Sequence, residues 1–164
     1  MLEPIDNKTP LFFPVSRLKL VVMSFCTLGL YQIYWFYENW QLYREREEER
    51  IYPLIRAVLA IVYAYALFKE VKQAAQKYGA SLPPNIAVLA GLYVVLNLLG
   101  FAPTALVWLS LTAVFVLLPI QEVVNEVNRR ATPDVPPNAQ FTPLNFVALL
   151  VGSVVWGILL TAVF

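Results

Sequence analysis

The feature of this sequence that most limits its fold is the length of its stretches without a charged residue. Residues 143–164 contain no Asp, Glu, Lys or Arg, and neither do residues 85–119. A helix of about 20 apolar residues spans a hydrocarbon layer roughly 30 Å thick. The first stretch is therefore predicted to be one transmembrane helix. The second is interrupted by Gly100 and Pro103, so it is predicted to be two helices joined by a tight turn.

Two shorter apolar segments come before these stretches. Residues 18–40 are predicted to form a leading membrane segment that crosses the bilayer, with a re-entrant hairpin bent at Gly29 as the alternative. Residues 53–68 are short for a crossing unless Arg56 reaches the interface along its apolar stem. The predicted fold class is an all-α polytopic transmembrane bundle of about five membrane segments, of which the first two are short or re-entrant.

An internal repeat supports the number five. Residues 70–85 align with residues 122–138, and each copy contains Glu-Val, a polar helix and a Pro-Pro-Asn corner. A duplicated unit implies that its first apolar segment is inserted in the membrane in both copies. The predicted organisation is a single transmembrane domain over residues 1–164, with the leading segment 18–40 followed by parallel repeat units 51–101 and 102–164.

Each repeat unit prolongs its apolar segment as an amphipathic helix. The apolar positions recur at helical spacing, and polar residues occupy the opposite side. The apolar face comprises Phe68, Val71, Ala75 and Tyr78 in the first unit and Ile120, Val123, Val124 and Val127 in the second. We predict that these helices pack on each other or lie along the membrane surface, with a docking surface for a cytoplasmic partner as the functional alternative.

Lysine and arginine fall unevenly between the predicted loops, which sets the expected orientation. With the N-terminus inside, eight basic residues face the inner side and four, in residues 44–56, face the outer side. The prediction is a multi-pass protein with a cytoplasmic N-terminus. If residues 18–40 form a hairpin, residues 38–56 also stay on the inner side, and three full crossings remain.

The residues that are missing limit the chemistry. The sequence has no histidine and one cysteine, Cys26. Histidine is the commonest general base and the commonest ligand of several metals, and one cysteine excludes an internal disulfide. A net charge of +1 does not indicate a nucleic-acid partner. We predict no catalytic residue, no metal site and no cofactor, and the weaker alternative is a lipid-modifying enzyme that uses Arg56 with Glu38, Glu70 or Glu122.

An aromatic cluster of seven side chains lies between Tyr31 and Tyr43. Tyrosine and tryptophan concentrate at the bilayer interface, because the ring prefers the boundary while the polar group reaches water. An interfacial aromatic belt is therefore predicted. The alternative is a cage for a cationic headgroup or amine, lined by Phe36, Trp40 and Tyr43 beside Glu38.

Arg56 is a charge inside an otherwise apolar segment. Charges at membrane depth usually have a partner, and Glu38 is the nearest candidate in either topology. The predicted site for lipid, a partner or an ion pair comprises Glu38, Arg56, Phe36, Trp40 and Tyr43.

Residues 27–40 contain the pattern TLGLY-x-x-YWFY-x-x-W. This pattern resembles that of a family of small bacterial inner-membrane proteins, a domain of unknown function. Residues 119–145, with PIQEVVNEVNRR and PPNAQFTPLN, resemble the tail of the same family. The resemblance implies an integral protein of a bacterial cytoplasmic membrane, and it implies no activity and no catalytic residues.

The function predicted from these features is non-enzymatic. The chain is expected to be a scaffold or accessory subunit that binds membrane lipid, a partner membrane protein or a second copy of itself. The alternative is a small-solute or ion transporter or channel formed by the repeats, with Arg56, Gln32 and Asn97 as its polar groups.

Overall fold

The computed structural model describes residues 9–102, 105–136 and 138–163. Over these residues the chain is helical and contains no β-strand, which confirms the all-α class. Pro103 and Pro137, which the sequence places at a helix start and in a corner, lie outside the described residues.

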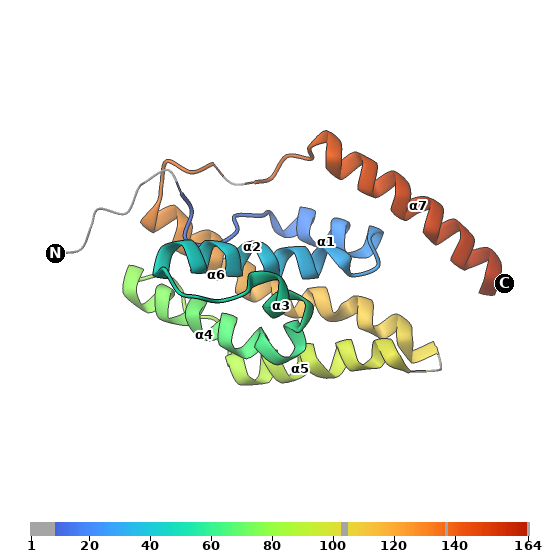
Figure 1. Ribbon diagram of the computed structural model, residues 1–164, viewed down its shortest axis with the longest axis horizontal. Helices are drawn as coiled ribbons and strands as arrows, with labels where there is room; N and C mark the ends of the chain where they lie inside the picture. The colour runs from blue at the N-terminus through green and yellow to red at the C-terminus, as the bar shows by residue number, and fades with distance from the viewer. Residues whose placement is uncertain (1–8, 103–104, 137, 164) are drawn as a thin grey trace.

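The leading segment folds as two helices. Helix α1 (Arg17–Cys26) is capped by Ser16, whose hydroxyl accepts a hydrogen bond from the Lys19 N–H, and helix α2 (Leu30–Glu47) follows. Between them the chain reverses, with Leu28 and Gly29 at positive φ (Figure 1). Glycine adopts this conformation without steric cost, which explains the position of the turn. The reversal at Gly29 agrees with the hairpin alternative for residues 18–40 and not with the preferred single crossing.

The second apolar segment is also divided. Helix α3 (Pro53–Val58) starts with proline at a position where a helix tolerates it, and it packs against α2. After Leu59, helix α4 (Ala60–Tyr78) carries the chain through the predicted amphipathic extension without a break. Gly79, in the left-handed conformation, ends α4.

The third part of the chain is an antiparallel helical pair followed by a separate helix. Helix α5 (Ile86–Leu98) and the 3₁₀ helix η1 (Leu99–Phe101) lead away from α4, and η2 (Ala105–Thr112) and α6 (Ala113–Ala131) return beside them (Figure 1). Helix α7 (Pro143–Val163) then packs on α1.

Helix length and composition identify one candidate membrane span among the described residues. This span is the continuous run Leu106–Ala131, and the apolar helices Ile86–Phe101 and Pro143–Leu159 are shorter. The five-segment bundle therefore stays a prediction.

The two amphipathic extensions pack on each other, as predicted. Helices α4 and α6 are in contact. Phe68, Val71 and Ala75 on α4, together with Ile120 and Val124 on α6, are fully buried. These faces form the centre of the core, because each helix covers the apolar stripe of the other.

The two Pro-Pro-Asn corners differ in structure. Asn85 caps α5, since its side-chain oxygen accepts hydrogen bonds from the N–H groups of Ala87 and Val88. Asn138 caps no helix among the described elements. Its N–H donates to the Pro14 carbonyl, and its own carbonyl accepts from the Ser16 N–H. As a result, α5 folds back beside α4, whereas the chain after α6 first crosses to the N-terminal segment.

The N-terminal segment, residues 11–16, is extended and largely buried between α2 and α6. Side-chain amides satisfy its backbone. Asn128 accepts from the Phe12 N–H at 3.1 Å and donates to the Phe12 carbonyl at 2.7 Å. Asn39 accepts from the Phe13 N–H, and Gln121 donates to the Phe13 carbonyl. These bonds offset the cost of burying irregular backbone.

Charge divides the molecule into two halves. Every charged residue of the described part lies in residues 17–19, 38–56, 69–77 or 122–134. These segments meet in space. Arg17 pairs with Glu122 at 3.1 Å, and the Ser81 N–H donates to Glu126 at 3.1 Å. We call residues 9–19, 38–56, 69–85 and 122–142 the charged half, and residues 20–37, 57–68, 86–121 and 143–163 the uncharged half.

The uncharged half exposes large apolar side chains on several helices. They include Val62 on α4, Val95 on α5, Phe115 on α6 and Leu150 on α7. Proteins in water seldom expose apolar surface that continues over several elements.

Candidate functional site

The predicted site around Arg56 is a packed cluster. Helix α3 places the Arg56 guanidinium 4.5 Å from the centre of the Trp40 ring and 5.3 Å from that of Tyr63. Trp40 is 1% exposed. A guanidinium over an indole face is a favourable cation–π contact. The ring face that a bound amine would use is thus covered by the chain's own arginine.

The other predicted site residues fall around this cluster. Tyr43 meets the Trp40 ring edge-on at 5.6 Å, whereas Phe36 is buried against Phe68 and Tyr93. Among the described residues the ion pairs are Arg17–Glu122, Arg46–Glu47 and Arg130–Glu126. The predicted pair of Glu38 with Arg56 is therefore not formed in the part of the chain that the structure describes.

Most of the aromatic cluster belongs to the core instead of an interfacial belt. Tyr31, Trp35, Phe36 and Trp40 are buried, and only Tyr34 is exposed. The Trp35 N–H donates to the side-chain oxygen of Gln121 on α6. The belt prediction was wrong for these buried rings, because α2 turns them toward α6 and the N-terminal segment.

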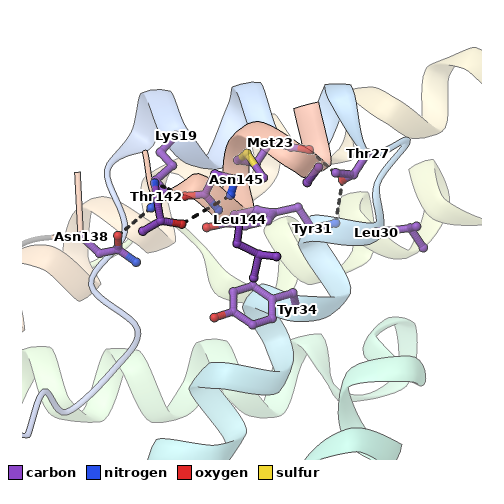
Figure 2. Close-up of a pocket in the computed structure, with 11 residues that line it drawn as sticks. Lys19, Met23, Thr27, Leu30, Tyr31, Tyr34, Asn138, Thr142, Leu144 and Asn145 are labelled. Atoms are coloured by element: carbon purple, nitrogen blue, oxygen red, sulfur yellow. Dashed lines mark hydrogen bonds between the residues drawn. The ribbon is translucent and has the colours of Figure 1, made fainter. Parts of the chain in front are cut away.

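A pocket of about 360 Å³ lies between α1, the start of α2 and the start of α7 (Figure 2). We call it the Lys19 pocket. It is lined by Lys19, Met23, Thr27, Leu30, Tyr31, Tyr34, Asn138, Thr142, Leu144, Asn145 and Ala148. The sequence alone did not single it out, because its walls come from segments more than one hundred residues apart.

Among the residues that the structure describes, Lys19 is the one charged side chain that lines this pocket. It is 2% exposed, and its ammonium group donates to the side-chain oxygen of Asn138 and to the carbonyl of Gln140, both at 2.7 Å. No ion pair involves it among the described residues. Burying a charge without a counter-charge is unfavourable, so this lysine is an unusual feature of the fold.

A second pocket lies within the uncharged half. It has a volume of about 630 Å³, and an adjoining space of about 160 Å³ shares Tyr93, Asn97 and Ser110 with it. Gln32 lines the smaller space, is 3% exposed, and its side-chain oxygen has no hydrogen-bond partner among the described residues. We call both spaces together the Gln32 cavity. Two of the three polar groups predicted for a transporter, Gln32 and Asn97, thus lie together, whereas Arg56 lies on Trp40.

Polar contacts in the charged half tie α4 to α6. The Ser81 N–H, and then Arg130, lower the pKa of Glu126. Arg130 also donates to the Gly79 carbonyl. On α4, burial raises the pKa of Glu70, and the nearby carboxylates of Glu47 and Glu49 add to this effect. Neither Glu70 nor Glu126 lines a pocket described above, so these carboxylates give no geometry for acid–base chemistry.

No group of His, Cys, Asp and Glu in the described ranges is arranged to hold a metal ion. Comparison of the chain with family models, curated proteins and solved structures gave no match in any of the three.

Proposed function

We propose that this chain is a non-enzymatic integral protein of a bacterial cytoplasmic membrane, a scaffold or accessory subunit that binds lipid or a partner membrane protein. The observation that carries the proposal is the separation of the two halves. The uncharged half exposes apolar side chains on α4, α5, α6 and α7, and the charged segments gather at the other end. A bilayer and its aqueous border would match these two surfaces.

The hairpin leads to a specific topology. Helices α1 and α2 enter the membrane and return, and α3 with the first half of α4 does the same. Residues 85–101, 103–119 and 143–164 would then make three full crossings. All described basic residues lie in the charged half, and placing that half on the inner side satisfies the preference of lysine and arginine for the cytoplasm.

Fractionation tests membrane integration. Native membranes that contain the chain are washed with alkaline carbonate, which strips peripheral proteins, and then dissolved in detergent. The chain is expected to stay with the membranes and to be released only by detergent. Release by carbonate would contradict the proposal.

The role as an accessory subunit has its own test. Cross-linking in native membranes, followed by purification, is expected to recover a defined partner or a second copy. Recovery of only the monomer and lipid would refute the role as a subunit while leaving membrane integration intact.

Transport of a small neutral solute is a second candidate, favoured by the unsatisfied amide of Gln32 in a cavity within the uncharged half. The described walls of this cavity carry no charge, so an ion would meet no counter-charge there. Flux into liposomes is expected to fall for Gln32→Leu and Asn97→Leu. Unchanged flux in both variants, or no flux of any tested solute, would refute this candidate.

A further inference from the structure

The Lys19 pocket runs from the charged half into the uncharged half. Lys19 and Met23 on α1 and Thr27, which directly follows α1, recur every four residues and line one wall. Lys19 lies at the charged end of this wall, and Leu30 lies at the opposite side of the pocket (Figure 2). Ala148 of the uncharged half also lines the pocket. The pocket therefore has a polar, cationic end and an apolar end.

In the described part of the chain, no acidic side chain lines the cationic end. An ammonium group has three N–H donors, and the bonds to Asn138 and Gln140 use two of them. Both acceptors are neutral, so they orient the ammonium group without cancelling its charge. The other polar lining groups, among them Thr142 and Asn145, are hydroxyls and amides.

Helix α7 adds to the positive potential at this end. It is 21 residues long, starts at Pro143 beside the pocket and has no acidic residue in its first turn. The N-terminus of a helix carries a partial positive charge that favours anions. A buried lysine and a helix N-terminus thus act in the same direction.

We propose that the Lys19 pocket binds an anionic phospholipid, with the headgroup phosphate at Lys19 and the start of an acyl chain along Met23, Leu30 and Ala148. The inference rests on the proposed membrane location, because the border between the halves is where headgroups would lie. A volume of about 360 Å³ is in the range of sites that take ligands with polar and apolar parts. The apolar wall favours a lipid over free phosphate.

The test compares lipids and variants on the full chain in a neutral detergent. Phosphatidylglycerol and phosphatidylcholine with identical acyl chains are titrated, and binding is followed by native mass spectrometry and by the thermal unfolding midpoint. Lys19→Gln removes the charge and keeps two N–H donors for Asn138 and Gln140. Lys19→Arg keeps the charge, and Lys69→Gln removes an exposed charge on α4 as the matched control.

The original chain, Lys19→Arg and Lys69→Gln are expected to bind phosphatidylglycerol at least tenfold more tightly than phosphatidylcholine, and Lys19→Gln is expected to lose this preference. Equal preference in Lys19→Gln and the original chain would overturn the proposal. If inorganic phosphate raises the thermal unfolding midpoint of the chain as much as phosphatidylglycerol does, the ligand is a free anion and the lipid proposal is overturned.

If Lys19→Gln does not fold, Ala148→Trp provides the second variant, because it fills the apolar end and leaves Lys19 in place. It is expected to lose lipid binding with an unchanged circular dichroism spectrum, and unchanged binding would overturn the proposal. If the original chain shows no preference for phosphatidylglycerol but still resists carbonate, the pocket alone is refuted. A chain released by carbonate would refute the membrane location.

Discussion

The two halves of this molecule are built by different means. In the charged half, side-chain amides, carboxylates and helix caps form hydrogen bonds with backbone groups. These bonds, together with ion pairs between side chains, hold the N-terminal segment, α2, α4 and α6 together. In the uncharged half, α7 approaches α1 so closely at Gly152 that a Cβ there would overlap the Cys26 carbonyl. Stacked Trp108 and Trp156 hold η2 and α7 together in the same region.

This difference is the one that the proposed membrane location predicts at the border of the two halves. Apolar burial drives helices together in water, whereas in a bilayer close packing of small residues takes over. The proposed membrane location predicts the first kind of packing for the charged half and the second kind for the uncharged half.

A lysine placed on the exposed surface of each half should have opposite consequences. Leu150→Lys on α7 is expected to destabilise the inserted protein by about 3 kcal/mol, the cost of a lysine at the centre of a membrane helix. Leu82→Lys in the charged half should change stability by less than about 0.5 kcal/mol, since it faces water. The two positions are comparably exposed, at 67% and 54%. If the fraction of protein inserted in the membrane changes by a similar small amount in both variants, the two halves do not differ in their surroundings.

Two glycines of α7 distinguish close packing from helix propensity. Gly152→Ala should separate α7 from α1 and lower stability by roughly 1–3 kcal/mol, as overpacking does. Gly157 has no neighbouring atom within 4 Å of an added Cβ. Gly157→Ala should therefore stabilise α7 by up to about 1 kcal/mol through helix propensity. Thermal unfolding in detergent measures both, and a shift of the same sign would contradict close packing at Gly152.

Arg56 lies on Trp40 at the border of the halves. Arg56→Ala is expected to cost about 1–2 kcal/mol, the range for a partly desolvated cation–π contact. Tryptophan fluorescence should change with it, because the buried Trp40 ring loses its covering guanidinium. Arg50→Ala, which removes an exposed charge from the loop before α3, should change neither signal. Equal effects of the two substitutions would mean that the stacking contributes nothing.

The smallest effect concerns Glu126 in the charged half. The Ser81 N–H and Arg130 lower the pKa of this carboxyl, so its ionised form stabilises the fold above the ordinary glutamate pKa. That contribution is lost as the pH falls through the lowered pKa. The thermal midpoint of Glu126→Gln is expected to vary less between pH 7 and pH 3 than that of the original chain. Identical pH profiles would refute the role of Glu126.

Helical periodicity predicted one part of the fold correctly. The helical spacing of Phe68, Val71 and Ala75 predicts an apolar face on α4, and the same spacing on α6 predicts a second one. Apolar faces of this kind must pack against another surface. Burial of the aromatic cluster was not predictable in this way, because Trp and Tyr suit both a core and an interface.

The contacts that define the sites depend on tertiary arrangement. Glu38 and Trp40 are two residues apart on α2, so they point in nearly opposite directions, and α3 packs on the side of Trp40. Sequence proximity alone favoured Glu38 as the partner of Arg56. Gln121, Asn125 and Asn128 form a row of side-chain amides at helical spacing, and this row can be seen in the sequence. The backbone that they bond belongs to the extended N-terminal segment, more than one hundred residues away, so this partner could not be predicted.

Accessibility to a membrane-impermeant maleimide tests most directly whether the uncharged half lies in lipid. Single cysteines are placed at Val62, Val151, Lys69 and Gln76 in a chain with Cys26→Ser, and open membrane fragments are labelled. All four positions are exposed in the structure. Lys69→Cys and Gln76→Cys should react at once, whereas Val62→Cys and Val151→Cys should be protected until the membrane is dissolved and the chain unfolded. Equal labelling of all four in intact membrane fragments would contradict the account.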